Sequence, residues 1–336
     1  MRSRCIVVAV LLALAAALLT AACDGGGSSL TVYSGRSEDL VQPVIDRFTE
    51  ETGIDVDVRY GETAELAATI LEEGSNTPAD VYFGQDAGAL GALAEEGRLV
   101  DLPEVILELV PPTFRSHDGV WVGVSGRARV VAYNTETVDP AELPDSILDF
   151  TGEEWRGRIG WAPTNGSFQA FVTALRLIEG EDGAREWLEG IVANDPTEYP
   201  NNVTALEGAA NGEVDVAFVN HYYLLRALAE QGEGFGARNH YLAGGDPGAL
   251  VNVAGAGILD ASDHREEAER LLEFMLSAEA QEYFAEETFE YPLIDGVEAD
   301  PELVPLSDLD PPEIDLSDIA DLEGTLDLLR ATGVLP

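Results

Sequence analysis

The chain has no lysine and only two cysteines, Cys5 and Cys23. All 18 of its Lys and Arg positions are arginine, against 63 Asp and Glu residues, so the formal net charge is -45. A surface this acidic repels nucleic acids and anionic lipid headgroups, so neither is expected as a binding partner. We interpret the acid excess as a solvated surface suited to high salt, which says little about the ligand.

The N-terminal segment accounts for both cysteines. An apolar run over 6–19 follows a short basic stretch and is too short to favour a spanning helix, so residues 1–22 are expected to be a signal peptide. Cys23 follows Leu-Thr-Ala-Ala, which resembles a bacterial lipobox, and is the expected lipidation site at the head of a Gly/Ser tether over 23–29. Because Cys5 lies in the signal peptide, the mature chain has no internal disulfide or thiolate metal site. We expect an exported lipoprotein at the outer face of the cytoplasmic membrane, in the periplasm or on the cell surface.

The rest of the chain alternates strand-like and helix-like segments. Predicted strands over 30–34, 54–58 and 81–83 are each followed by a helical pattern, which predicts a parallel sheet with helices on both faces. Two further strands, over 121–134 and 250–259, are interpreted as crossings between two lobes. The expected fold is α/β, a two-lobed periplasmic-binding-protein clamshell. Each lobe is a mainly parallel sheet flanked by helices, two strands cross the hinge, and a ligand lies between the lobes.

The mature chain of roughly 300 residues exceeds the usual size of a single core, which also favours two lobes. Lobe 1 is expected over 30–128 plus 253–288, and lobe 2 over 129–252 plus 289–336. The segment 264–288 has an amphipathic pattern and is predicted as one long helix.

A tyrosine pair stands at a predicted junction of strand and helix. The apolar run 214–219 reads as a buried strand and 222–231 as a helix, so Asn220–Tyr223 should lie where the strand ends. In open α/β sheets ligands bind outside the carboxyl ends of strands. The two phenols are therefore placed to bind a ligand, although such a pair, taken alone, is more often half-buried packing.

Two other features have two interpretations each. The turn over 164–167 is rich in Thr, Asn, Gly and Ser and opens a predicted helix, so it either offers donors to an anion or simply caps the helix. Arg127 and Arg129 share one face of a strand. They are either paired with the surrounding acids or line the cleft and attract an anion.

Taken together, these features resemble the periplasmic ferric-iron-binding proteins of bacterial ABC transporters, the transferrin-like solute receptors. The resemblance covers nearly the whole mature chain. Its markers are Leu30–Arg36, Glu50–Ile54, Pro78–Val81, Ser125–Val131, Asn211–Val214, Asn220–Tyr223 and Asp246–Leu250. It implies a monomeric receptor that delivers Fe(III) to an ABC permease and its ATPase, attached to the membrane through Cys23.

The resemblance also implies a site in the cleft. Tyr222 and Tyr223 would bind Fe(III) as phenolates, since a coordinating cation can remove the proton of a phenol at neutral pH. A synergistic anion, carbonate, phosphate or citrate, is implied at Thr164, Asn165, Gly166, Ser167, Asn202 and Asn220. The other candidate cleft residues are Arg36, Ser37, Gln85, Asp86 and Arg127.

The chain departs from the family pattern in the first lobe. Ser37 stands where many members have a ligating His, and Gln85 stands where they have a Glu, with Asp86 beside it as a candidate substitute. Trp161 occupies the position of a third tyrosine found in some members, and His221 is expected to turn away from the metal. We therefore predict that lobe 2 holds Fe(III), with anion, water or a small chelator completing the coordination.

Two alternatives remain at this point. The first is a receptor for an organic anion, a phosphorylated sugar or a ferric chelate, held by the anion turn and Arg127 without a full set of protein ligands. The second is an exported hydrolase or isomerase. The sequence has no nucleophile–base pair, and its four histidines are scattered, so we expect no enzymatic activity.

Overall fold

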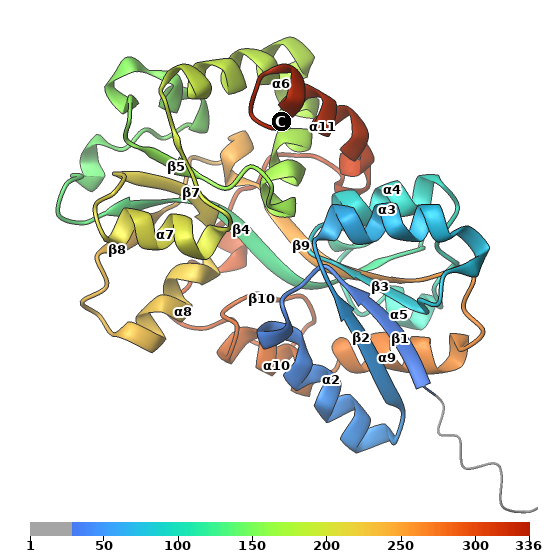
Figure 1. The fold of residues 1–336 in the computed structure, drawn as a ribbon. Coiled ribbons are helices and arrows are strands. Elements are labelled where there is room, and N and C mark those ends of the chain that lie inside the picture. The colour runs from blue at the N-terminus through green and yellow to red at the C-terminus, as the bar shows by residue number, and fades with distance from the viewer. Residues whose placement is uncertain (1–28) are drawn as a thin grey trace, which may run out of the picture.

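The structure is a computed structural model that describes residues 29–336, so the predicted signal peptide and Cys23 lie outside the described residues. Figure 1 shows two lobes, each with helices packed around part of one sheet. The strand order is β2-β1-β3-β9-β4-β7-β5-β6, and β8 and β10 (Tyr291–Pro292) both pair with β4. This arrangement confirms the predicted two-lobed α/β fold. Within the described part of the chain, every helix is too short or too polar to cross a membrane.

Lobe 1 presents two loops at one edge of its sheet. Its strands are β1 (Ser29–Ser34), β2 (Asp55–Tyr60), β3 (Val81–Gly84) and β9 (Val251–Ile258). Its helices are α2 (Glu38–Thr52), α3 (Thr63–Glu73), α4 (Ala87–Glu95), α5 (Glu104–Leu107), α9 (Arg265–Met275) and α10 (Ala278–Glu286). Because β1 pairs in parallel with β3, the loops after both strands reach the same edge. These loops carry Arg36, Ser37, Gln85 and Asp86 to the cleft.

Lobe 2 is the second α/β unit. Its strands are β5 (Ile159–Trp161), β6 (Thr197–Glu198), β7 (Val216–Asn220) and β8 (Ala237–His240), and its helices are α6 (Gly166–Ala193), α7 (Asn202–Ala210) and α8 (Tyr222–Gln231). β5 pairs in parallel with β7. The chain segments that follow these two strands, which open α6 and α8, therefore lie at the same edge and face lobe 1 (Figure 1).

Strand β4 (Val122–Asn134) joins the two lobes. Its first half, Val122–Ala128, pairs with β9, and its second half, Arg129–Asn134, pairs with β7 and β8. All but one of its residues are buried, and its 13 residues are more than one strand of a single lobe needs. Strand β9 lies wholly against β3 and the first half of β4, so the chain returns to lobe 1 just before Val251.

The predicted long helix over 264–288 is wrong in one respect, because two helices stand in its place. α9 ends at Met275 and α10 begins at Ala278. The Ser277 side chain accepts a hydrogen bond from the Ala280 backbone N–H at 3.3 Å, so it caps a new helix. The amphipathic pattern continues through the break because both helices pack on the same core.

The C-terminal segment contacts both lobes. The turn η8 (Leu316–Ala320) lies so close to α4 that a Cβ on Gly91 would be 2.7 Å from the Ala320 Cβ. The following helix α11 (Leu322–Ala331) packs on α6, where the Thr173 and Thr325 hydroxyls are 2.7 Å apart. This segment therefore ties the two lobes together on the side of α4 and α6 (Figure 1).

Candidate functional site

The tyrosine pair opens helix α8, at the junction that the sequence predicts. β7 ends at Asn220 and α8 begins at Tyr222, with His221 between them. The rings of Tyr222 and Tyr223 have centroids 4.1 Å apart and an interplanar angle of 31°. Tyr222 is buried and Tyr223 is half-buried, and both line a cavity of about 640 Å³. The pair is therefore not simply core packing.

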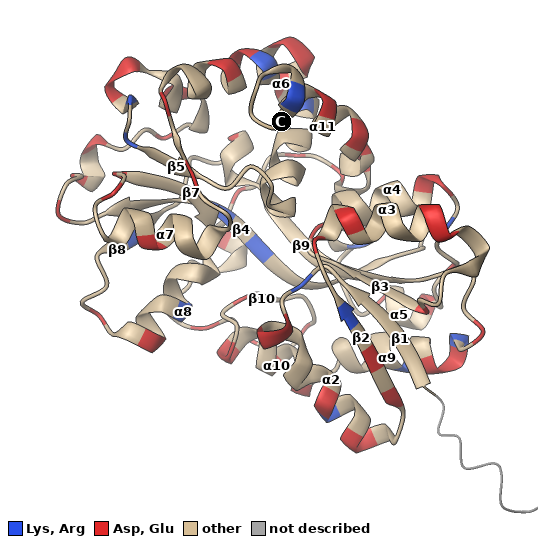
Figure 2. Cartoon of the chain, in the orientation of Figure 1, with Lys and Arg blue, Asp and Glu red and all other residues tan. Residues whose placement is uncertain are grey.

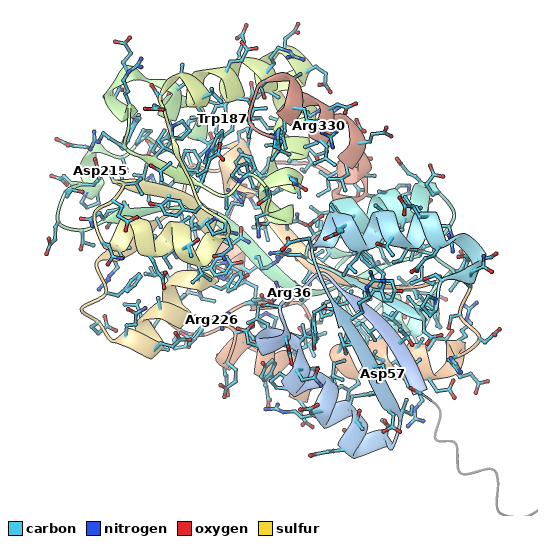
Figure 3. The ribbon with its side chains drawn as sticks, in the orientation of Figure 1. Arg36, Asp57, Trp187, Asp215, Arg226 and Arg330 are labelled. Atoms are coloured by element: carbon cyan, nitrogen blue, oxygen red, sulfur yellow. The ribbon has the colours of Figure 1, made fainter. Side chains whose placement is uncertain are left out.

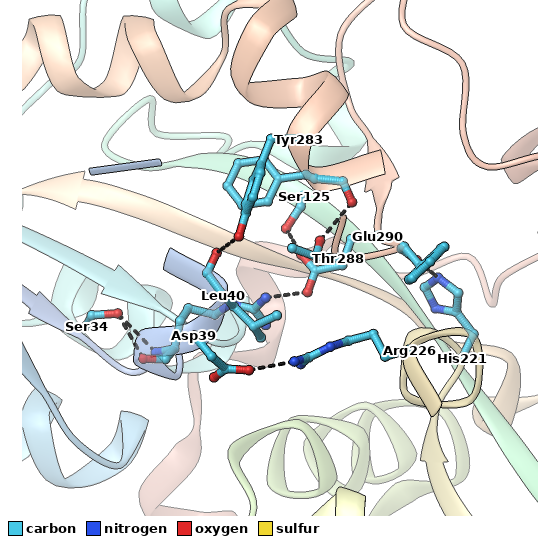
Figure 4. A network of polar contacts seen from close by, with 12 residues as sticks. Ser34, Asp39, Leu40, Ser125, His221, Arg226, Tyr283, Thr288 and Glu290 are labelled. Carbon is cyan, nitrogen blue, oxygen red and sulfur yellow. Dashed lines mark hydrogen bonds and ion pairs between the residues drawn. The ribbon is translucent and has the colours of Figure 1, made fainter. Parts of the chain in front are cut away.

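Residues of both lobes line this cavity. Lobe 1 contributes Arg36, Ser37 and Gln85, so the predicted candidates from both loops reach the tyrosines. An ion pair closes one side of the cavity, because the Arg226 guanidinium on α8 (labelled in Figure 3) donates to the Asp39 carboxylate on α2 at 2.6 Å, as Figure 4 shows. The two lobes are therefore in direct contact through this ion pair at the edge of the cavity.

The predicted anion turn is organised by Asn165. The Asn165 Oδ1 atom accepts hydrogen bonds from the Ser167 backbone N–H at 3.1 Å, the Ser167 hydroxyl at 2.6 Å and the Asn202 amide at 3.1 Å. These residues therefore come together at the start of α6, where Gly166 is the first helical residue. The Phe168 backbone N–H of this first turn donates to the Asn165 carbonyl at 3.0 Å. Thr164 is exposed at the rim.

Several buried polar groups near the turn lack a partner within residues 29–336. None of the three guanidinium nitrogens of Arg127 has one, and neither do the Asn220 Nδ2 and Asn202 Oδ1 atoms. Arg127 forms no ion pair with the surrounding acids, and burial, followed by its neighbour Arg36, lowers its pKa. Buried polar groups normally find a partner, so these atoms indicate a place for an anion or ordered water.

Arg129 has a different role from Arg127. Its guanidinium stacks on the Phe171 ring at 4.9 Å and donates to the Ser167 backbone carbonyl at 3.3 Å. Burial lowers the pKa of Arg129 to about 9. Within residues 29–336 Arg129 forms no ion pair with an acid, so the ion-pair interpretation is wrong for this arginine.

Asp86 does not line the tyrosine cavity. It caps α4, where its Oδ1 atom accepts from the Ala89 backbone N–H at 3.1 Å. Its Oδ2 atom points at the start of α6, because a Cβ on Gly166 would be 2.8 Å away from it. Burial raises the pKa of Asp86 to about 6. The structure thus places this carboxylate against the anion turn and outside the cavity.

His221 turns away from the cavity, as predicted. Its Nδ1 atom accepts from the Ala128 backbone N–H at 3.1 Å, and its Nε2–H donates to the Phe289 carbonyl at 2.9 Å. Burial lowers the pKa of His221 to about 4. Both ring nitrogens therefore form hydrogen bonds to backbone groups at the hinge, and the imidazole stays neutral.

The charge around the site contrasts with the rest of the molecule. Figure 2 shows acidic residues spread over the outer helices, whereas β4 carries basic residues between the lobes. Arg36, Arg127 and Arg129 are all buried there. Burial, followed by Tyr223, raises the pKa of Tyr222 well above its usual value, while Arg36 and Arg127 act in the opposite direction. The buried guanidinium groups thus favour an anion at the base of the site, while burial disfavours the charged form of Tyr222 itself.

Sequence reasoning missed two residues that shape the site. Arg226 lies four residues after Tyr222, so the helical period places both on the same face of α8. This spacing in the sequence could have identified Arg226 as a site residue. Glu290 is buried and binds Arg36 and Ser125, which are 254 and 165 positions away in the chain. No local pattern in the sequence points to such long-range partners.

Comparisons with known proteins find relatives that match most of this chain. The family described as bacterial extracellular solute-binding protein matches residues 76–313. The major ferric iron-binding protein of Neisseria meningitidis serogroup B is 35% identical over 327 residues, which cover 96% of this chain and 98% of that protein. The crystal structure of iron-bound HitA from Pseudomonas aeruginosa is 39% identical, with a TM-score of 0.87 over 91% of this chain and 99% of that one. A Trichodesmium protein, IdiA or FutA, in complex with iron and citrate is 30% identical, with a TM-score of 0.78 and the same two coverages.

Proposed function

The chain belongs to the bacterial extracellular solute-binding proteins, among the periplasmic ferric-iron-binding proteins, and we propose that it is the Fe(III) receptor of an ABC importer. In this proposal it is exported, held at the membrane by a lipid on Cys23, and passes iron to a permease driven by an ATPase. It acts as a monomeric receptor without catalytic activity.

The observation that carries the proposal is the tyrosine pair in the interlobe cavity. Fe(III) is a hard, highly charged ion that prefers anionic oxygen ligands. Tyr222 and Tyr223 line one cavity with rings 4.1 Å apart, so both phenolate oxygens can reach one ion. Within the described residues, no group of three or more His, Cys, Asp or Glu side chains could hold a metal. The tyrosines are therefore the protein's anionic ligands in this proposal.

A synergistic anion balances the remaining charge. Two phenolates neutralise only part of the charge of Fe(III), and the buried arginines favour a further anion. Arg127 and the Asn220 amide have no partner in residues 29–336, and the Asn165–Ser167 turn opens α6 with its positive dipole end. In the proposal, carbonate, phosphate or citrate binds these donors and completes the coordination.

Lobe 1 contributes no strong ligand in this proposal. Ser37 and Gln85 line the cavity, but both are neutral, and Asp86 faces the start of α6 instead. The remaining positions on the metal are therefore taken by the anion, by water or by a small chelator. A cavity of about 640 Å³ has room for such a chelator.

The test is a visible absorption titration of the full mature chain with ferric citrate. Phenolate bound to Fe(III) gives a charge-transfer band that surface carboxylates do not give. We expect a saturable one-to-one band in the wild type and its loss in Tyr222→Phe and in Tyr223→Phe. Tyr60→Phe is the matched control, because Tyr60 lines the same cavity but donates to Gln42 at 2.7 Å. A wild type without a band would contradict the proposal.

The alternative ligand is an organic anion such as a phosphorylated sugar. The size of the cavity suits this class, as does Arg127, which has no partner in the described part of the chain. If phosphate esters raise the unfolding temperature and ferric citrate gives no band, the protein is an organic-anion receptor, and the tyrosines are ring platforms.

A further inference from the structure

Arg36 comes from lobe 1 but lies over a tyrosine of lobe 2. It follows β1, and its guanidinium carbon is 5.9 Å from the centroid of the Tyr222 ring. Both side chains are buried, with exposed fractions of 2% for Arg36 and 1% for Tyr222. This separation is within the range of about 6 Å at which a cation interacts favourably with an aromatic face. Arg36 is thus a point at which lobe 1 contacts a proposed metal ligand.

A buried carboxylate fixes the position of this guanidinium. The Arg36 Nη2 group donates to one oxygen of Glu290, and the Ser125 hydroxyl donates to the other (Figure 4). Glu290 is fully buried, and the Arg36 Nε has no partner within residues 29–336. Burial acts to lower the pKa of Arg36, but Glu290 and the two tyrosines outweigh it and raise the pKa. Arg36 is therefore a permanent cation held in one place.

The same short segment also holds the start of α8. The carbonyl of Phe289, the residue before Glu290, accepts from His221 Nε2 at 2.9 Å. The ring of Tyr291, the residue after it, stacks on His221 with centroids 4.7 Å apart. Phe289 has a φ of 58°, which is uncommon for a residue other than glycine and marks a backbone held by its surroundings. The segment Phe289–Tyr291 thus sets the position of Arg36 relative to Tyr222.

We propose that Arg36 is the positioning residue through which lobe 1 controls iron held by lobe 2: its cation stabilises the charge on the Tyr222 phenolate, and Glu290 holds it there. This inference rests on the proposed function. Lobe 1 places a charge beside the ligand, where neutral Ser37 and Gln85 provide none. The other groups that act on the charge of Tyr222 are Glu290, Arg127, Arg226 and the adjacent Tyr223.

The proposal makes an unusual spectroscopic prediction. In the charge-transfer transition an electron moves from the phenolate to Fe(III), so a cation beside the phenolate lowers the donor level and raises the transition energy. In a buried site with a low effective dielectric, such a charge has a larger effect than in water. Removing Arg36 should therefore move the band to longer wavelength, and neutralising Glu290 should move it to shorter wavelength. A residue that only supports the fold would not produce opposite shifts.

The experiment compares R36Q and E290Q with the wild type in the full mature chain, loaded with Fe(III) from ferric citrate. We expect R36Q to shift the band to longer wavelength and to weaken iron binding by about 10–100-fold, the usual cost of losing an outer-shell partner. E290Q should shift the band to shorter wavelength. The matched control is R59Q, because Arg59 lies 4.8 Å from the Tyr33 ring and outside the cavity, and it should leave the band unchanged.

A second variant guards against misfolding. R36K keeps the positive charge, so it should restore the band most of the way to the wild-type wavelength even if R36Q is unstable. The inference is overturned if the band stays at the wild-type wavelength in R36Q and E290Q, or moves in the same direction in both. If the wild type shows the band but the band does not shift in the variants, only this inference fails and the proposed function stands. If the wild type shows no band, both the inference and the proposed function fail.

Discussion

Across the cavity, the β7–α8 junction of lobe 2 presents two phenols, whereas the loops after β1 and β3 in lobe 1 present Ser37 and Gln85. Lobe 2 also has the helix start organised by Asn165, with three donors on one amide oxygen. Lobe 1 instead has Arg36, a buried cation fixed by Glu290. If the proposed function holds, two equivalent sheet edges have different roles: lobe 2 supplies the metal ligands, and lobe 1 supplies a buried charge and a wall of the cavity.

The first prediction concerns the hinge of lobe 2. The folded-state pKa of His221 lies at about 4, below its usual 6.5, because the imidazole is buried. A lowered histidine pKa contributes stability above pH 6.5 that is lost as the pH falls toward 4, by about 3 kcal/mol. Chemical denaturation from pH 7.5 to 4 should therefore show this loss in the wild type and a smaller one in His221→Asn. His117→Asn, at an exposed position, should keep the wild-type slope.

Asp86 of lobe 1 should show the opposite sign. Burial raises its pKa from 3.8 to about 6, so its contribution to stability is present below pH 3.8 and lost as the pH rises through 6. Asp86→Asn keeps the side-chain oxygen that caps α4 and removes this loss. The variant should be more stable than the wild type by about 2–3 kcal/mol at pH 7.5, with the difference vanishing near pH 4. A variant less stable at pH 7.5 would show that the carboxylate is satisfied by a partner.

Arg127 tests whether the anion depends on the base of the site. Replacing it with Met removes a cation that has no partner within residues 29–336 but keeps much of its volume. We expect the concentration of phosphate or carbonate that supports half-maximal iron binding to rise about 10–100-fold, as for other outer-shell residues. Arg129→Met is the comparison, because Arg129 donates to the Ser167 carbonyl instead. An unchanged anion requirement in Arg127→Met would assign the anion to the α6 turn alone.

A smaller effect is expected from the ion pair between the lobes. Arg226 and Asp39 are partly exposed, with side-chain fractions of 23% and 57%, so their coupling should be about 0.2–1 kcal/mol. A double-mutant cycle with Arg226→Gln and Asp39→Asn, read out as iron affinity, should give a coupling that shrinks in 1 M salt. A coupling energy that is the same in 1 M salt would mean that this ion pair does more than close the cavity.

The smallest effect should come from the lobe 1 loops. Because Ser37 and Gln85 are not ligands in this account, Ser37→Ala and Gln85→Ala should each change the iron affinity by less than about threefold, or about 0.7 kcal/mol. Competition with citrate in equilibrium dialysis measures this directly. A loss above tenfold in either variant would break the contrast between the lobes.

Much of the fold could be read from the sequence because it follows local patterns. Apolar runs and helical periods predict the strands, and parallel pairing brings the 164–167 turn and the tyrosine pair to one edge. The break at Ser277 was missed because the apolar period continues across it. The Arg36–Glu290 pair was missed because its two residues are 254 positions apart in the sequence and meet only in the folded chain.

The central claim is that lobe 2 supplies every protein ligand to the metal. A crystal structure of the iron-loaded mature chain tests it most directly. The account predicts Fe(III) bonded to the Tyr222 and Tyr223 oxygens, with all remaining positions taken by anion, chelator or water, and with Arg36 over the Tyr222 ring. An oxygen of Ser37, Gln85 or Asp86 bonded to the iron would contradict it.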